Sequence, residues 1–210
     1  MKKTLAIIGS GHLGQQIAHY AISDNHYDKI VFFDDFATES EINGYAILGN
    51  SDGIEIEYSK KSFDELIIGI GYNHLLVRKA LFERFSGIIP FGKIIHSSSW
   101  VDSTAKIGHG SVIYPCCNID ANVIIENNVI INISSVIAHD TKIDSHCFIS
   151  PRAALAGFIH IEEMCIIGIN STIIDNITIT SKTRLGGGTV VIKNIDNSGL
   201  YVGNPQRFVR

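Results

Sequence analysis

Residues 118–140 read NIDANVIIENNVIINISSVIAHD, with an isoleucine at every sixth position from Ile119 to Ile137. The period continues in both directions without an insertion, because all 17 positions at this spacing from Ile95 to Val191 are isoleucine, leucine or valine. The residue two places before most of these positions is small or β-branched, as at Ser135. Such a hexapeptide repeat predicts a parallel β-helix, in which three short strands make an 18-residue coil and equivalent residues stack in adjacent coils. Between five and six coils are expected.

A different pattern precedes the repeat. An apolar run at residues 4–8 is followed by GSGHLG at residues 9–14 and an amphipathic segment to about Ser23. A strand, a glycine-rich turn and a helix in this order are typical of a Rossmann-like domain, where a phosphate approaches backbone N–H groups at the start of the helix. A second predicted strand, residues 30–33, ends at Asp34 and Asp35, from which a carboxylate can bind ribose hydroxyls.

A third predicted strand, residues 66–68, ends at Gly69 and Gly71, and Asn73 is expected to cap a helix to about Phe85. Ligands of open α/β sheets bind at the carboxyl ends of the strands, so these segments predict one nucleotide site. About 90 residues are too few for a complete dinucleotide fold, which favours a single nucleotide, as in a nucleotide-sugar. The expected binding residues of this domain are Gly9, Gly11, His12, Asp34, Asp35, Gly69, Gly71 and Asn73.

The chain is therefore expected to have a Rossmann-like α/β domain at residues 1–92, a left-handed β-helix at 93–196 and a C-terminal cap and tail at 197–210. Its net charge of −4 disfavours a nucleic-acid partner. No apolar run approaches the roughly 20 residues of a membrane span, and no signal-peptide pattern is seen, so a cytoplasmic location is expected. The cysteines follow no zinc spacing, and Cys117, Cys147 and Cys165 occupy small-residue positions of the repeat.

The stacking of coils predicts which residues of the repeat are neighbours. His139 is expected to project outward from a wall of the β-helix, directly above Gly157, which lies 18 residues later. The glycine leaves room beside the imidazole and exposes a backbone N–H. Asn170 stacks in the same way on Gly188, and the glycines around them predict a shallow groove on an outer wall that suits a thin, extended ligand.

These motifs together resemble the bacterial nucleotide-sugar N-acetyltransferases of the left-handed β-helix superfamily, which include related sialic acid O-acetyltransferases. The resemblance covers nearly the whole chain. It rests on the glycine-rich turn, FDDF at residues 33–36, GIGYN at 69–73, NISSVIAHD at 132–140, GINS at 168–171, LGGG at 185–188 and VGNP at 202–205.

The resemblance implies a homotrimer with active sites between subunits, acetyl-CoA bound along the β-helix and no metal. His139 matches the family's catalytic histidine, Asp140 its acidic partner, Gly157 a glycine whose amide faces the thioester, and Asn132 a polar residue near the acceptor. It also implies transfer of acetyl to a 4-amino-4,6-dideoxy sugar for surface polysaccharide, such as O-antigen. The expected acetyl-CoA residues are Gly157, Gly168, Asn170, Gly187, Gly188, Lys193, Asn204 and Pro205.

One position departs from the family pattern. Phe148 stands where many members have a second histidine that helps to hold acetyl-CoA, and His146 lies on a different offset of the repeat. Contacts to acetyl-CoA near this point, and the identity of the acyl group, are therefore open.

Three other functions fit parts of the sequence. A sugar O-acetyltransferase would use the same base on a hydroxyl group. A γ-class carbonic anhydrase would bind zinc through histidines such as His109, His139 and His146, although the spacing of His109 and His139 places them on different walls. A sensor that binds sugar nucleotides without catalysis would leave His139 merely exposed.

Overall fold

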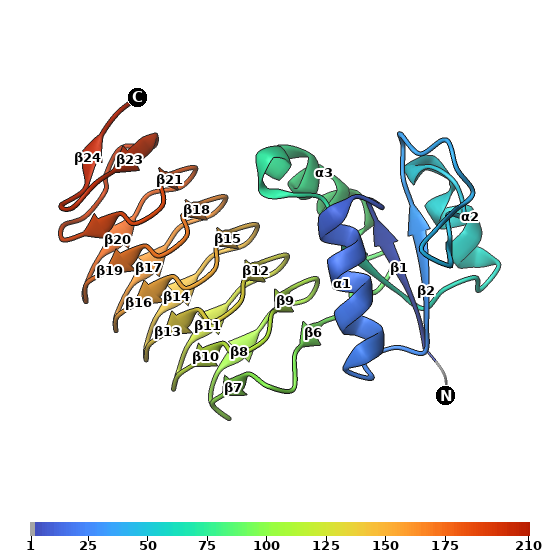
Figure 1. Cartoon of the computed structure of the whole chain (residues 1–210), viewed down its shortest axis with the longest axis horizontal. Coiled ribbons are helices and arrows are strands. Elements are labelled where there is room, and N and C mark those ends of the chain that lie inside the picture. Colours follow the sequence, from blue (N-terminus) through green and yellow to red (C-terminus); the bar gives the residue numbers. More distant parts are fainter. Residues whose placement is uncertain (1–2) are drawn as a thin grey trace. The chain divides into compact units, whose positions relative to one another are not determined.

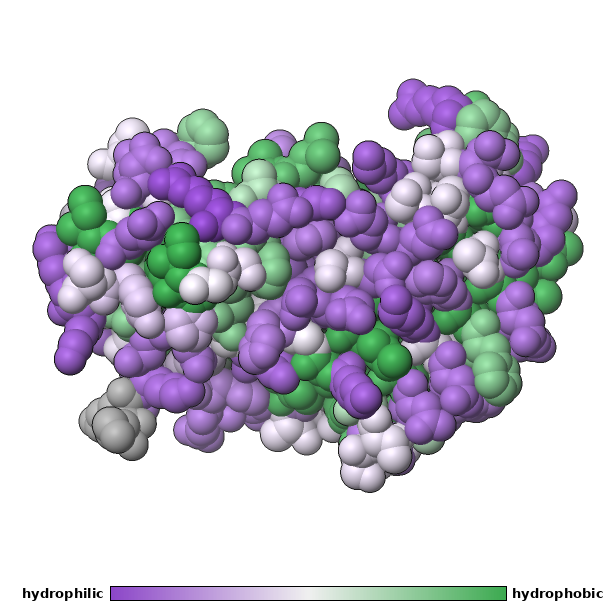
Figure 2. All heavy atoms as spheres, turned by 180° about the vertical axis from the view of Figure 1, so that it is seen from behind, coloured by the Kyte–Doolittle hydropathy of each residue, from purple (hydrophilic) through white to green (hydrophobic). Residues whose placement is uncertain are grey.

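The computed structural model describes residues 3–210, which divide into two compact units at the boundary between Ile94 and Ile95. The first unit is an α/β domain and the second is a β-helix (Figure 1). Within the described residues no helix is long and apolar enough to cross a membrane. Hydrophilic side chains cover much of the face drawn in Figure 2, with apolar patches scattered among them.

The first unit is built on a three-stranded parallel sheet in the order β2-β1-β5. All three strands are apolar and buried from their second residue onward, as expected for strands that are covered on both faces. The β3–β4 hairpin and helix α2 were not predicted from the sequence. The elements are β1 (Thr4–Ile8), α1 (His12–Ser23), β2 (Lys29–Phe33), β3 (Glu41–Ile42), β4 (Tyr45–Ala46), η1 (Ser51–Gly53), α2 (Ile54–Ser59), β5 (Glu65–Ile68), η2 (Tyr72–His74) and α3 (Leu75–Phe85).

The turn between β1 and α1 is tight enough to require glycine. A Cβ atom on Gly14 would lie 1.9 Å from the carbonyl oxygen of Gly9, and one on Gly69 would lie 2.6 Å from the Cα of Gly14. The end of β5 therefore packs directly against the glycine-rich turn. This close approach of backbones forms the floor of the site described below.

The second unit confirms the predicted repeat. Each of the 17 predicted aliphatic residues is the second residue of a two-residue strand, and from Ile113 to Val191 these side chains form one buried core. Burying an isoleucine contributes about 1.5–3 kcal/mol. The strands are β6 (Ile94–Ile95), β7 (Trp100–Val101), β8 (Lys106–Ile107), β9 (Val112–Ile113), β10 (Asn118–Ile119), β11 (Ile124–Ile125), β12 (Ile130–Ile131), β13 (Val136–Ile137), β14 (Lys142–Ile143), β15 (Phe148–Ile149), β16 (Ala154–Leu155), β17 (His160–Ile161), β18 (Ile166–Ile167), β19 (Thr172–Ile173), β20 (Thr178–Ile179), β21 (Arg184–Leu185) and β22 (Val190–Val191).

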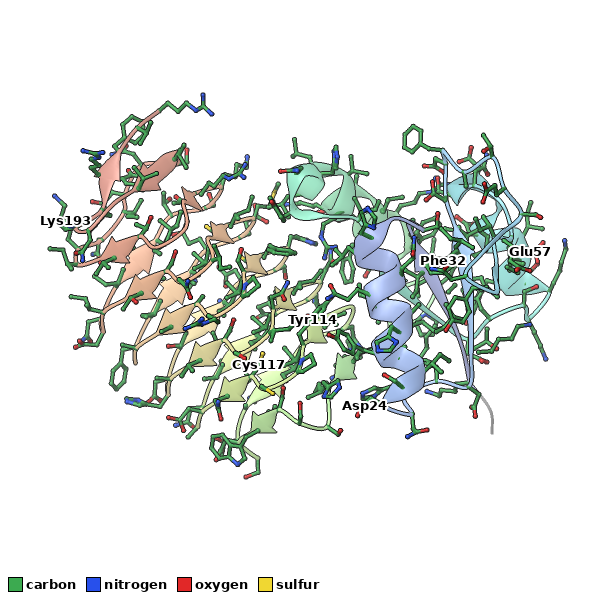
Figure 3. The ribbon with its side chains drawn as sticks, viewed as in Figure 1. Asp24, Phe32, Glu57, Tyr114, Cys117 and Lys193 are labelled. Carbon is green, nitrogen blue, oxygen red and sulfur yellow. The ribbon has the colours of Figure 1, made fainter. Side chains whose placement is uncertain are left out.

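The strands form three parallel walls that meet at three corners. The six-stranded wall contains β7, β10, β13, β16, β19 and β22, the five-stranded wall runs from β8 to β20, and the eight-stranded wall contains β6, β9, β12, β15, β18 and β21 with the C-terminal strands. Cys117, Cys147 and Cys165 are buried at the small-residue positions, and Figure 3 shows Cys117 within the coils. These cysteines pack as the repeat predicts.

The corners impose a left-handed backbone conformation once in every six residues. Positive φ angles recur at that spacing from Cys116 to Lys182, and only four of these twelve residues are asparagine. Asparagine tolerates this conformation, whereas Phe158 and Arg152 adopt it at a steric cost. The stacked hydrogen bonds of adjacent coils hold these turns, as in the bond from Asp140 N to the carbonyl oxygen of Ala121 at 2.9 Å.

The C-terminal segment adds two strands to the eight-stranded wall. β23 (Leu200–Val202) pairs in parallel with β21, and β24 (Arg207–Phe208) pairs antiparallel with β23. Between them, Gln206 is buried and hydrogen-bonds to Ile192 N and to the carbonyl oxygen of Lys193. The segment thus attaches to the last coil through both backbone and side-chain bonds.

Candidate active site

His139 lies in the turn between β13 and β14, at the corner between the six-stranded and five-stranded walls. We call this turn and its equivalents in other coils the His139 corner. The expectation that His139 projects from a wall is therefore wrong, because each strand has only two residues and the third residue of the repeat already belongs to the turn. Its side chain is 49% exposed, so the imidazole can reach a ligand.

Asp140 is the hydrogen-bond partner of His139. The distance from His139 Nδ1 to Asp140 Oδ2 is 3.0 Å, and Asn122 Nδ2 donates to Asp140 Oδ1 at 3.1 Å. The hydrogen bond with His139 has the largest effect on the pKa of Asp140. Together with the hydrogen bond from Asn122, it holds this pKa below its usual range. The ionised carboxylate favours the tautomer with its proton on Nδ1, which leaves Nε2 able to accept a proton.

Gly157 lies directly against the imidazole, as the stacking predicts. A Cβ atom on Gly157 would lie 2.6 Å from His139 Cε1 and 2.9 Å from Nε2. Phe158 packs edge-on against the same ring, with centroids 5.1 Å apart. Glycine at 157 thus leaves the space that the imidazole occupies, which any larger residue would overlap.

The other predicted residues of the β-helix lie mainly at a second corner, between the eight-stranded and six-stranded walls, which we call the Asn132 corner. Asn132 precedes β13 whereas His139 follows it, so one chain places them at opposite edges of the six-stranded wall. Asn132 Oδ1 accepts a hydrogen bond from Ile133 N at 2.9 Å. The predicted groove on a wall is also corrected, because its glycines lie in corner turns. The residues at this corner are Asn132, Gly168, Asn170, Gly187 and Gly188.

The remaining expected acetyl-CoA residues lie near the C-terminal end of the β-helix. Lys193 continues the column of His139 and Gly157, three coils beyond His139, and is exposed. It is labelled at the end of the β-helix near the C-terminus in Figure 3. Asn204 and Pro205 are in the connection between β23 and β24, next to Gln206, whose side chain accepts a hydrogen bond from Ile192 N and donates one to the carbonyl oxygen of Lys193.

The histidines proposed for a zinc site do not converge within the chain. His109 and His146 lie at the third corner, between the five-stranded and eight-stranded walls, away from the corner of His139. His146 is buried and its Nδ1 is 3.0 Å from Asn128 Nδ2. Within residues 3–210 no group of three potential metal-ligating side chains comes together. Phe148, the departure from the family pattern, is buried in β15 on the eight-stranded wall.

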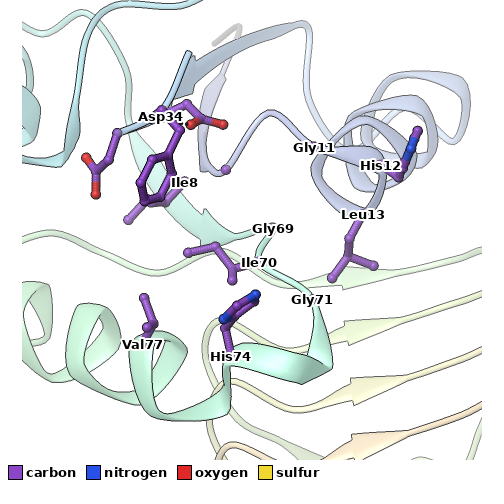
Figure 4. Close-up of a pocket in the computed structure, with 13 residues that line it drawn as sticks. Ile8, Gly11, His12, Leu13, Asp34, Gly69, Ile70, Gly71, His74 and Val77 are labelled. Atoms are coloured by element: carbon purple, nitrogen blue, oxygen red, sulfur yellow. Dashed lines mark hydrogen bonds between the residues drawn. The ribbon is translucent and has the colours of Figure 1, made fainter.

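The α/β unit contains a cavity of about 600 Å³ at the carboxyl ends of β1, β2 and β5 (Figure 4). Seven of the eight residues predicted for this domain line it, the exception being Asn73. His74 and Val77 point toward this space from the start of α3, and the sequence reasoning missed both. The lining residues are Ile8, Gly9, Gly11, His12, Leu13, Asp34, Asp35, Phe36, Gly69, Ile70, Gly71, His74 and Val77.

Asp34 organises the glycine-rich turn beside this cavity. Its Oδ2 accepts hydrogen bonds from both the backbone N and the hydroxyl of Ser10, each at 2.7 Å, and its Oδ1 accepts one from Phe36 N at 2.9 Å. Partial burial opposes the charge, but these bonds outweigh it and lower the pKa of Asp34. Asp35 is more exposed and accepts a hydrogen bond from Ser51 N at 2.7 Å.

Asn73 does not cap helix α3 as the sequence predicted. A short 3-10 turn, η2, separates the end of β5 from the helix, so His74 occupies the N-cap position, without a side-chain cap hydrogen bond. The extra turn places His74, rather than Asn73, beside the cavity. An N-cap preference alone could not reveal this turn, because asparagine is equally suited to either structure.

The chain is similar to known proteins in both of its units. Residues 4–85 match the model of the PglD N-terminal domain family. The first unit is thus similar to the PglD N-terminal domain. A GDP-perosamine N-acetyltransferase of Escherichia coli O157:H7 is 30% identical over 128 residues, 61% of this chain and 55% of that protein. The alignment thus spans about half the length of this curated relative.

Solved structures match the whole chain. The acetyltransferase domain of PglB from Neisseria gonorrhoeae FA1090 is 28% identical, with a TM-score of 0.92 over 99% of this chain and 100% of that one. The same domain has been solved with acetyl coenzyme A, at 27% identity and a TM-score of 0.91, with all of both chains covered. PerB from Caulobacter crescentus, solved with CoA and GDP-perosamine, shares the fold at 23% identity, with a TM-score of 0.87 over 99% of this chain and 97% of that one. The predicted fold class and the resemblance to nucleotide-sugar N-acetyltransferases are confirmed.

Proposed function

We propose that this chain is an acetyl-CoA-dependent N-acetyltransferase that acts on the 4-amino group of a nucleotide-linked 4-amino-4,6-dideoxy sugar. The observation that carries this proposal is the His139–Asp140 pair lying against Gly157. A nucleotide-sized cavity at the strand ends of a unit similar to the PglD N-terminal domain supports it, as does the likeness to the acetyltransferase domain of PglB and to a GDP-perosamine N-acetyltransferase.

The residues at the His139 corner suit direct transfer. The sugar amine attacks the thioester carbonyl of acetyl-CoA, and His139 Nε2 accepts the proton that the nitrogen loses. The imidazolium is stabilised by Asp140 and then protonates the CoA thiolate as the tetrahedral intermediate collapses. The N–H of Gly157 stabilises the oxyanion, a contribution of about 3 kcal/mol for such donors. No acyl-enzyme forms, so the cysteines have no part in the reaction.

Both corners of the β-helix take part in this proposal. Acetyl-CoA is bound by the glycines of the Asn132 corner, by Asn204 and Pro205, and by Lys193 in the column of His139. The active protein is a homotrimer in which the His139 corner of one subunit faces the Asn132 corner of its neighbour. It works in the cytoplasm, where acetyl-CoA and sugar nucleotides are made, and its product enters a surface polysaccharide.

An acceptor screen tests the activity. Purified protein with acetyl-CoA is offered UDP-, dTDP- and GDP-linked 4-amino-4,6-dideoxy sugars, and free thiol release is followed; the matched 4-hydroxy sugar nucleotides are the controls. We expect one amino sugar to be acetylated at nitrogen, which gives a product stable to mild base. A base-labile ester on a hydroxyl would show an O-acetyltransferase instead, and no thiol release with any acceptor would contradict the proposal.

A further inference from the structure

Arg78 is a fully buried arginine on the face of α3 that packs under the nucleotide cavity. Its side chain is 0% exposed, and its Nη1 donates to the carbonyl oxygen of Ile68 at 3.0 Å and to that of Ile70 at 2.8 Å. Arginines are rarely buried to this extent unless the charge is hydrogen-bonded, because removing a cation from water is costly. The two carbonyl groups therefore help to compensate the buried charge of Arg78.

The two carbonyl groups that Arg78 binds flank Gly69, where the chain leaves β5 and enters the cavity wall. On its other side this segment is fixed by the glycine-rich turn. Gly69 N donates to the carbonyl oxygen of Ile8 at 2.8 Å, and a Cβ atom on Gly9 would lie 3.1 Å from Ile70 Cγ1. Residues 69–71 are thus held between the glycine-rich turn and a buried guanidinium.

Residues 69–71 are also part of the cavity lining. Gly69, Ile70 and Gly71 all line it, and Gly71 is the N-cap of the turn that carries His74. Figure 4 shows Ile70 and His74 on the same side of the cavity. Any shift of the carbonyl of Ile70 therefore moves both the lining backbone and the start of α3. Arg78 itself is not a lining residue and lies one peptide layer behind the surface.

We propose that Arg78 is a positioning residue for the nucleotide diphosphate of the sugar substrate, an inference that rests on the proposed function. One guanidinium nitrogen, Nη1, binds both carbonyl groups, and the planar group is more rigid than a lysine side chain, so it holds residues 69–71 in the shape that binds the ligand. Its charge also places a cation behind the lining, where Asp34 and Asp35 otherwise make the cavity acidic. Both effects favour an anionic diphosphate.

The test compares Arg78→Met and Arg78→Lys with the wild-type protein. Calorimetric Kd values are measured for GDP, UDP and dTDP, along with the KM of each substrate, kcat and Tm. Arg84 provides a matched control on the same helix, because its guanidinium is 3.2 Å from Asp52 Oδ1 and partly exposed rather than buried. We expect Arg78→Met to weaken nucleotide binding at least about tenfold, as for lost hydrogen bonds to a charged group, with the KM for acetyl-CoA unchanged. Arg78→Lys should recover part of this loss, and Arg84→Met should change none of these values.

Amide hydrogen exchange on the ligand-free protein separates this inference from the proposed function. Arg78→Met should speed exchange in residues 66–74 while leaving the β-helix unchanged, whichever nucleotide is the ligand.

Normal nucleotide affinity and normal exchange in a folded Arg78→Met protein would overturn the inference. Equal rises in the KM of both substrates with a lower kcat would also overturn it, since they indicate general damage. If Arg78→Met does not fold, the same measurements on Arg78→Lys test the inference. Wild-type protein that binds none of the nucleotides would contradict the proposed function, and the exchange result would still decide whether Arg78 holds the loop.

Discussion

At the scale of single residues, the candidate base is supported by an aspartate in an unusual backbone conformation. Asp140 has a φ of 56°, in the left-handed region that aspartate enters more readily than most residues. This conformation belongs to the corner, because the equivalent residues 122 and 158 share it. The corner therefore provides the turn that holds a carboxylate beside His139.

Replacing His139 with alanine is expected to lower kcat by at least the 10²-fold typical of a lost general base. Binding of both substrates should persist, because the backbone of the corner is held by stacked hydrogen bonds rather than by the imidazole. Steady-state kinetics and calorimetric binding measure the two effects. Adding a Cβ in Gly157→Ala should also reduce kcat, since that atom would overlap the imidazole.

A second histidine–aspartate pair serves as the control. His160 Nε2 lies 3.0 Å from Asp144 Oδ2 on the five-stranded wall, in a comparably exposed position. His160→Ala should leave turnover within about twofold of the wild type, as a surface ion pair contributes little. Near-normal turnover of His139→Ala would refute the role of this histidine, whatever the result for His160.

At the scale of elements, the glycine-rich turn depends on a carboxylate from the neighbouring strand. Asp34→Ala would leave the N–H and hydroxyl of Ser10 unpaired in a buried position, at a cost of about 1–3 kcal/mol. We expect the KM for the sugar nucleotide to rise at least about tenfold, equivalent to about 1.4 kcal/mol, with the KM for acetyl-CoA unchanged. Ser10→Ala, which keeps the backbone hydrogen bond, should have a smaller effect. Substrate-dependence kinetics distinguish these outcomes.

The matched control is Asp28→Ala, because Asp28 Oδ2 accepts a hydrogen bond from Lys3 N, away from the carboxyl ends of the strands. It should leave both KM values unchanged. The pKa of Asp34 is lowered in the fold, so its stabilisation is fully present above the unfolded value of about 3.9 and is lost only as pH falls through the lower folded value. An unchanged affinity of Asp34→Ala at neutral pH would place the nucleotide elsewhere.

The sequence predicted the strands of the β-helix, but not the turn that holds His139 or the burial of Arg78. Hydrophobic periodicity located the strands from β6 to β22, because each carries one aliphatic residue that packs in or against the core at an unvarying spacing of six residues. It could not locate the corner turn that holds His139, because the left-handed position of such turns, which is Asp140 in this one, accepts residues as different as Phe158 and Arg152. The burial of Arg78 could not be predicted either, because an arginine in a helix ordinarily faces solvent and its burial depends on tertiary contacts.

At the scale of the whole molecule, the β-helix presents its expected residues at two different corners. His139 and Gly157 follow strands of the six-stranded wall, while Asn132, Gly168 and Gly187 precede them. In a cyclic trimer, each interface pairs one surface of a subunit with a different surface of the next. A site built from both corners then needs two subunits, even though each chain contains every required residue.

Mixed trimers of two inactive variants test this arrangement. His139→Ala removes the base, and Gly187→Glu places a bulky anion at the exposed Asn132 corner, where it should repel acetyl-CoA. Each variant alone should form inactive trimers. When equal amounts are co-expressed with different tags, an interface is intact only if the first subunit supplies His139 and the second supplies Gly187. Random assembly into cyclic trimers therefore predicts about one quarter of wild-type activity for the whole population, and about one third for mixed trimers purified through both tags. Light scattering and tandem affinity purification establish that the trimers are mixed. Mixed trimers without activity would place each complete site within one subunit.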